Sequence, residues 1–299
     1  MRLAIAIAAG FAAVVACQGA DSSAPQTRPD FKALDWVSDA ADPVAHLTLQ
    51  PATCLTAPRD PADQRGELLF NSPLLLGGPA AKAGLSCASC HRNGRGNPDF
   101  VFAGLSSGPG TADVTSGLFS KVRADQIFNP VVIPDLAAPE GHVLVDRGAA
   151  GALETFLSAQ ITEEFSGAAP TGQVVADLAA YIRALDLVAC PNDSEQVQTW
   201  QDETKRLRAG AAYLASEPAG DLSAYRLAMR AALGRLYERY PETIFGAEVQ
   251  DLVSLGRELS QPDISSAALA ERVDALEEDL QLGERQSLYS EEQLARALR

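Results

Sequence analysis

Histidine and methionine are scarce in this sequence, and their scarcity limits the metal chemistry that the chain can support. The 299 residues contain three histidines and two methionines, one of which is Met1. Outside the cysteines, the strong ligands for a transition metal are therefore His46, His91, His142 and Met229. The five cysteines include one closely spaced pair, Cys87 and Cys90. A zinc site built from two such pairs is excluded.

Basic residues are outnumbered by acidic ones. Lysine and arginine total 24 against 39 aspartates and glutamates, which gives a formal net charge of -15 and a sequence pI of about 4.6. Nucleic-acid binding needs a basic surface, so we expect no nucleic-acid partner. The acidic charge would instead steer the protein toward partners with basic docking surfaces and away from anionic lipid headgroups.

Long apolar runs are lacking except near the start of the chain. Residues 3–15 follow Arg2 and are apolar but too short to span a bilayer comfortably, which is typical of a signal peptide. The run ends Val-Val-Ala-Cys17, which resembles the lipobox of bacterial lipoproteins. The resemblance implies a lipoprotein signal peptide over residues 1–16 and lipidation of Cys17. The alternative is an ordinary secretory signal cleaved near Ala20, with Cys17 lost.

The expected location follows from this segment. Gln18, rather than an aspartate, comes after Cys17, which favours the outer membrane over inner-membrane retention. Residues 17–45 are expected to act as a tether, because residues 18–30 are small, polar and proline-containing. The sequence thus predicts a periplasm-facing protein anchored to the bacterial membrane through lipid alone.

Residues Cys87-Ala-Ser-Cys-His91 match the attachment pattern for c-type haem. Two thiols three residues apart on a helical turn reach the two vinyl groups of one porphyrin, and the next residue then lies under the iron. A redox-active dithiol would need a βαβ context, and a zinc site would need two further ligands; neither is found. We therefore expect one covalent haem c, bound by Cys87 and Cys90, with His91 as axial iron ligand.

Cys54 and Cys190 are the cysteines that remain, and they bracket this motif. Export implies an oxidising compartment in which free thiols are unusual. If Cys17 carries lipid and Cys87 and Cys90 carry haem, parity favours a Cys54–Cys190 disulfide over two separate buried thiols.

Two helical patterns flank the motif. Apolar residues follow Gly66 up to Phe70, and residues 173–187 form an amphipathic pattern whose apolar face includes Tyr181. In the cytochrome c fold, an N-terminal helix with a glycine and an aromatic residue crosses a C-terminal helix at another aromatic residue. The arrangement of Gly66, Phe70 and Tyr181 is similar to that pattern. It implies an all-α protein with a class-I-like cytochrome c haem domain at residues 46–192.

Three further segments resemble the haem domains of the di-haem cytochrome c peroxidase and MauG family. They are Asn129-Pro-Val-Val-Ile-Pro-Asp-Leu136, Leu153-Glu-Thr-Phe156 and Glu163-Glu-Phe-Ser-Gly167. The resemblance covers about residues 60–187. Members of that family carry two CxxCH motifs, whereas this chain carries one. It therefore implies a haem domain without implying the family's peroxidase activity.

The sixth iron ligand decides between functions. His142 lies in a loop whose position favours it, while Met229 on an apolar helical stripe and His46 ahead of the domain are weaker candidates. Two strong ligands would restrict the iron to electron transfer, so we expect a mono-haem electron carrier of the cell envelope. An open iron would instead give a peroxidase-like or gas-binding haem protein.

Other side chains bear on these alternatives. The candidates for a distal acid–base group are His142, Glu163 and Glu164. The candidates for a radical site, for which ordinary packing is the simpler role, are Trp36 and Trp200. One proline carbonyl is expected to accept a hydrogen bond from Nδ1 of His91. The candidates are Pro98, Pro130 and Pro134, and the sequence leaves the choice open.

Residues 193–299 are rich in Glu, Leu, Ala, Arg and Gln. Apolar residues recur at helical spacing, as at Leu269, Val273, Leu276 and Leu280. The pattern predicts an α-helical bundle packed on the haem domain. Its simplest role is structural; the alternative is a docking module that makes the protein a haem-bearing scaffold for partners.

Overall fold

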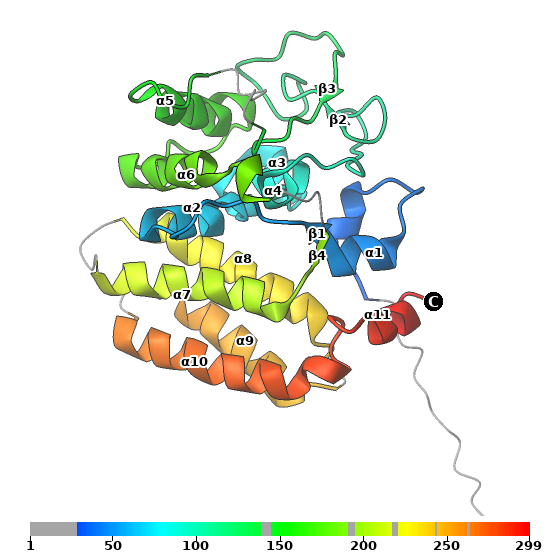
Figure 1. The fold of residues 1–299 in the computed structure, drawn as a ribbon, viewed down its shortest axis with the longest axis vertical. Coiled ribbons are helices and arrows are strands. Elements are labelled where there is room, and N and C mark those ends of the chain that lie inside the picture. The colour runs from blue at the N-terminus through cyan, green and yellow to red at the C-terminus, as the bar shows by residue number, and fades with distance from the viewer. Residues whose placement is uncertain (1–28, 139–144, 191–194, 217–220, 243, 262–263) are drawn as a thin grey trace, which may run out of the picture.

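The chain is mostly helical, in agreement with the all-α prediction. The computed structural model describes residues 29–138, 145–190, 195–216, 221–242, 244–261 and 264–299. The helices lie in layers, from α5 and α6 through α2 to α7 and α8, with α9 and α10 outermost (Figure 1). Within the described residues, none of the helices combines the length and apolar character needed to cross a membrane.

The first part of the described chain consists of short elements. They are η1 (Lys32–Trp36), α1 (Pro43–Thr48), β1 (Leu49–Pro51), α2 (Pro61–Phe70), η2 (Pro73–Leu75) and α3 (Gly78–Lys82). Helix α2 begins at Pro61 because Asp60 and Asp63 form a reciprocal capping box around its first turn.

The middle part contains the cysteine motif and long irregular loops. Its elements are α4 (Cys87–Cys90), η3 (Arg92–Gly94), β2 (Thr111–Ala112), β3 (Val131–Val132), α5 (Ala152–Ala159), the π-helical turn η4 (Gln160–Glu164), α6 (Gly172–Ala184) and η5 (Leu187–Ala189). Strands β2 and β3 pair antiparallel and join two of these loops.

The last part is the predicted bundle. Its elements are β4 (Glu195–Val197), α7 (Trp200–Ser216), α8 (Ser223–Arg239), α9 (Gly246–Glu258), α10 (Ser266–Gly283), η6 (Glu284–Gln286) and α11 (Glu291–Ala297). Strand β4 pairs antiparallel with β1 and so connects the start of the bundle to the N-terminal region.

Helices α2 and α6 cross at Gly66, as the sequence pattern predicts. A Cβ atom on Gly66 would lie 2.0 Å from the carbonyl oxygen of Asp177 and 2.7 Å from Cβ of Tyr181, so only glycine permits this approach. Beside the crossing, the rings of Phe70 and Tyr181 pack with their centroids 5.1 Å apart. The two helices that flank the motif in sequence thus form one packed unit.

The hydrophobic core continues across the predicted boundary at residue 193. One face of α2 packs on α6 and the other on α7 and α8, which places α2 between the upper and lower layers (Figure 1). A single cluster of buried side chains includes Leu68 from α2, Leu178 from α6, Leu207 from α7 and Met229 from α8. The bundle and the motif-bearing region therefore share a core.

Candidate functional site

The motif residues lie on one turn of helix. Ser86 precedes α4 and forms a capping box with Ser89, in which the amide of Ser86 donates to Ser89 Oγ at 3.0 Å. The amide of His91 donates to the carbonyl of Cys87 at 2.8 Å, and Asn97 Nδ2 donates to the carbonyl of Ser89 at 2.7 Å. These bonds hold both ends of the turn in place.

The ring of His91 is oriented by a neighbouring loop. Its Nδ1 atom lies 3.0 Å from the carbonyl oxygen of Pro134, so Nδ1 carries the donated proton and Nε2 keeps its lone pair. The structure thereby selects Pro134 from the three candidate prolines. Burial lowers the pKa of His91 to about 4, which keeps the imidazole neutral at pH 7. A neutral imidazole with a fixed Nδ1 proton suits axial ligation through Nε2.

The loop that carries Pro134 is itself anchored on the motif region. The amide of Ile133 donates to the carbonyl of Gly110 at 2.9 Å, and the amide of Leu136 donates to the carbonyl of Gly94 at 3.0 Å. These contacts join segments that are distant in sequence. They fix the carbonyl that orients His91.

The thiols of Cys87 and Cys90 are free and partly buried. Burial raises the pKa of each thiol to about 12, so both are protonated at neutral pH. Redox-active dithiols depend on a lowered thiol pKa, so this environment argues against that alternative. The thiols pack against an apolar cluster that contains Leu85, Phe100 and Phe119.

Aromatic rings surround the motif. The centroids of Phe102 and Phe119 lie 5.4 Å apart, and those of Phe119 and Phe165 lie 6.0 Å apart. On the side of α2, the ring of Phe70 lies 6.5 Å from that of His91. A haem needs two thiols, an axial imidazole and apolar surroundings for its flat porphyrin ring, and the side chains around this motif fit those needs. In the part of the chain that the structure describes, no three His, Cys, Asp or Glu side chains converge as direct ligands of a metal ion.

The candidate sixth ligands have different surroundings. His142 lies outside the described residues. Met229 is fully buried in the shared core, where a Cβ atom on Gly210 would lie 2.6 Å from its sulfur, so its surroundings are those of a packing residue. His46 lies in α1, and its Nδ1 atom is 3.3 Å from both Asp99 Oδ2 and Arg92 Nη1. Burial, reinforced by Arg92, lowers the pKa of His46 to about 4.

The two glutamates at the end of η4 differ in exposure. Glu163 is partly exposed and pairs with Arg123 at 2.8 Å. Glu164 is 3 % exposed, and its Oε2 atom has no hydrogen-bond partner among the described residues. Burial raises the pKa of Glu164. The next residue, Phe165, packs against the cluster that includes Cys87 and Cys90.

The two tryptophans are both buried. Trp36 belongs to the apolar cluster around the motif, whereas Trp200 begins α7 and belongs to the shared core. Their positions agree with the simpler role, which is packing.

Cys54 and Cys190 form a disulfide, the pairing that parity favours, and their Cα atoms are 5.1 Å apart. Beside it, the amide of Asp186 donates to the carbonyl of Cys54 at 2.8 Å, and the amide of Thr56 donates to the carbonyl of Ala184 at 2.9 Å. The bond therefore ties the end of α6 to the segment that leads into α2. Cys17, the expected lipidation site, lies outside the described residues.

A group of arginines lies beside the motif, and the sequence pattern did not predict it. Arg92 follows the motif directly, and Arg206, Arg235 and Arg239 come from α7 and α8 to line the same cavity. The four-residue spacing of Arg235 and Arg239, which places both on one helix face, was the only signal of it in the sequence.

No family model matches this chain, and comparisons with curated proteins and with solved structures find no match either.

Proposed function

We propose that this protein is a mono-haem c-type cytochrome that transfers electrons in the bacterial cell envelope. Cys87 and Cys90 would form the two thioether bonds, and His91 would be the axial ligand of the iron. The observation that carries the proposal is the CxxCH turn whose histidine donates its Nδ1 proton to Pro134, leaving Nε2 available. The bound haem would supply a one-electron Fe(III)/Fe(II) couple.

The helix crossing supports a cytochrome c-like haem domain. The close contact at Gly66 and the packed rings of Phe70 and Tyr181 have the positions that the resemblance implies. The Cys54–Cys190 disulfide agrees with an exported protein, because such bonds persist in oxidising compartments. The lipid anchor at Cys17 and the outer-membrane location belong to the same proposal. With a net charge of -15, the redox partners would carry basic docking surfaces.

A peroxidase-like or gas-binding function is the second candidate, and Glu164 is the observation that favours it. Glu164 is a buried carboxyl group whose Oε2 atom has no hydrogen-bond partner among the described residues, while its Oε1 atom lies 3.6 Å from Arg123. Burial raises its pKa, which favours the protonated form that a proton donor needs. Such a group beside an open iron would serve as a distal acid. The single CxxCH motif argues against the two-haem mechanism of the family that the segments resemble.

The optical spectrum of the purified holoprotein tests both functions. We expect a covalent c-type haem that is retained after denaturation and is absent from a Cys87→Ala, Cys90→Ala variant. A low-spin spectrum that CO does not change would support the electron carrier. A high-spin spectrum that shifts promptly with CO would favour the second candidate, and peroxide turnover in wild type and Glu164→Gln would follow.

The same spectra assign the sixth ligand. If His142 is the ligand, His142→Ala converts a low-spin spectrum to a high-spin one. Met229→Leu is the matched control, because it keeps the side-chain volume in the shared core and should leave the spectrum unchanged. A spectral change in Met229→Leu alone would instead assign the methionine.

A further inference from the structure

A cavity of about 290 Å³ lies between the motif and the bundle. Ala88, Ser89 and Arg92 line it from the motif side, whereas Cys87, Cys90 and His91 are not among its described lining residues. Helices α7 and α8 form the opposite wall. The cavity therefore lies behind the turn, away from the side chains that would bind a haem.

The lining of this cavity is rich in positive charge. Its cations are Lys32, Arg92, Arg206, Arg235 and Arg239, and its carboxylates are Glu203 and Glu238. This concentration of cations is unexpected in a chain with a net charge of -15. Such a site attracts anions, because nearby charges of one sign add in a cavity with low-dielectric walls.

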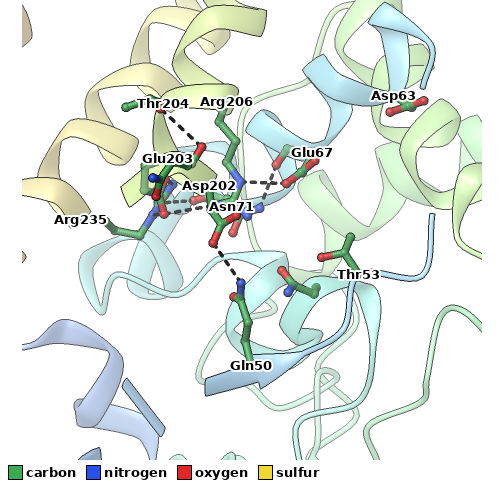
Figure 2. Close-up of polar contacts among 12 residues, drawn as sticks. Gln50, Thr53, Asp63, Glu67, Asn71, Asp202, Glu203, Thr204, Arg206 and Arg235 are labelled. Carbon is green, nitrogen blue, oxygen red and sulfur yellow. Dashed lines mark hydrogen bonds and ion pairs between the residues drawn. The ribbon is translucent and has the colours of Figure 1, made fainter. Parts of the chain in front are cut away.

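One carboxylate is already neutralised. Glu203 accepts two hydrogen bonds from Arg235, both at 2.8 Å, and one from Arg206 Nη1 at 3.0 Å (Figure 2). Arg206 also pairs with Glu67 at 3.1 Å (Figure 2). Despite its burial, the pKa of Glu203 is lowered to about 2 by Arg235 and Arg206. Glu67, Glu203, Arg206 and Arg235 thus balance one another's charge on the α7 side of the cavity.

Arg239 is a buried cation without such a partner. It is 6 % exposed and donates to two main-chain carbonyls, those of Leu47 at 2.6 Å and Leu288 at 3.0 Å. Its guanidinium lies over the rings of Phe31 and Tyr289, 5.1 Å from each centroid. Within the described ranges, Arg239 forms no ion pair with a carboxylate. Main-chain carbonyls and aromatic rings compensate only part of the free energy that is lost when a cation is removed from water.

Arg92 has a similar environment. It donates to the carbonyls of His46 at 2.9 Å and Leu49 at 2.8 Å. Asp99 and Glu195 act on it only at longer range, and among the residues described it too forms no ion pair with a carboxylate. Two desolvated guanidinium groups therefore line one cavity without a direct counter-charge.

We infer that this cavity binds a small oxyanion, a molecule with a carboxylate or phosphate group that supplies the counter-charge for Arg92 and Arg239. Guanidinium groups bind both anions through charge-assisted, often bidentate hydrogen bonds. Exposed Lys32 and Gly234 lie at the edge of the cavity, so an anion has a route from solvent. Glu238, the other carboxylate of the lining, is partly buried, and burial raises its pKa. The site uses no haem-binding side chain.

Titration calorimetry of the purified full-length protein with inorganic phosphate and with succinate tests the inference. We expect saturable binding of one anion per chain. Arg239→Gln should weaken it at least about tenfold, because a charge-assisted contact is lost. Lys32→Gln changes an exposed residue at the edge of the same cavity and should also weaken binding. It keeps the test valid if the Arg239→Gln variant does not fold. Lys205→Gln is the matched control, because Lys205 is exposed on α7 and does not line the cavity.

Absence of saturable binding of both anions to the wild-type protein would overturn the inference. So would binding that Lys32→Gln leaves unchanged, or that Lys205→Gln weakens equally, since the anion would then bind elsewhere. The two probes also distinguish a phosphate site from a carboxylate site. The haem spectrum is recorded separately, so failure of anion binding and failure of haem attachment are distinguishable.

Discussion

The hydroxyl of Tyr225 donates a 2.7 Å hydrogen bond to the carboxylate of Asp177, and this contact ties α8 to α6. Asp177 is fully buried and also accepts from Arg65, at 2.7 and 2.8 Å, and from Gln173 at 2.9 Å. The bundle is thus joined to the motif-bearing region by a polar network as well as by the shared core. Deleting the bundle would expose both, so single substitutions are the better tests.

Tyr225→Phe should destabilise the protein by about 1–3 kcal/mol, because it removes one partner of a buried carboxylate. Chemical denaturation followed by circular dichroism measures the change. Tyr237→Phe is the control, since Tyr237 lies in the same helix and is exposed. Equal effects of the two substitutions would show that the hydrogen bond to Asp177 contributes little.

Gly66→Ala should destabilise the protein by about 3 kcal/mol, the upper end of the usual cost of overpacking, because the new methyl group would overlap the backbone of α6 at the helix crossing. The matched control is Gly234→Ala in α8. No atom lies within 4 Å of the added Cβ there, and helix propensity favours alanine by about 1 kcal/mol. We expect opposite signs in urea unfolding. A tolerated Gly66→Ala would contradict the close packing of α2 on α6.

Loss of the Cys54–Cys190 bond should lower the free energy of unfolding. The bond joins residues 136 positions apart, and the chain-entropy model gives such a loop about 4–5 kcal/mol. Unfolding with and without a thiol reductant measures the loss, because thioether bonds resist the reductant. A Cys54→Ala, Cys190→Ala variant should then be insensitive to reductant. Identical wild-type curves under both conditions would argue that the disulfide does not stabilise the fold.

Because of Glu203, the free energy of unfolding should depend on pH in the acid range. Its pKa falls from 4.5 in the unfolded chain to about 2 in the folded protein, owing to its arginine partners. The contribution is therefore present above about pH 4.5 and is lost as the pH falls toward 2. Glu203→Gln should cost about 3 kcal/mol at pH 7, and its difference from wild type should shrink on acidification. A difference that stays constant from pH 6 to pH 3 would contradict this pKa.

Phosphate should lower the midpoint potential of the holoprotein, given the proposed haem and the proposed oxyanion site. Arg92 directly follows His91, so an anion bound to Arg92 would place negative charge near the iron and favour Fe(III). Redox titration with and without phosphate measures the shift. Lys32→Gln should reduce the response and Lys205→Gln should not. An upward shift, or an equal response in all three proteins, would contradict the coupling.

Several features were predictable from the sequence because they depend on local spacing or on simple counting. The helical turn at Cys87–His91 follows from the motif, and the helices around Phe70 and Tyr181 follow from apolar periodicity. The partner of Cys54 follows from parity once the other cysteines are assigned. None of these predictions depends on which segments, distant in sequence, come into contact.

Only the tertiary structure decided which carbonyl orients His91, because Pro98, Pro130 and Pro134 are equivalent as sequence and differ only in where their loops pack. It also decided that α2 is covered on both faces, so that one cluster of buried side chains runs from α6 through α2 to α7 and α8. The cationic cavity, too, was decided only by the tertiary structure. Net charge is a sum over residues, whereas Arg92 and Arg239 are far apart in sequence and line one cavity only because of how η3 and α8 pack.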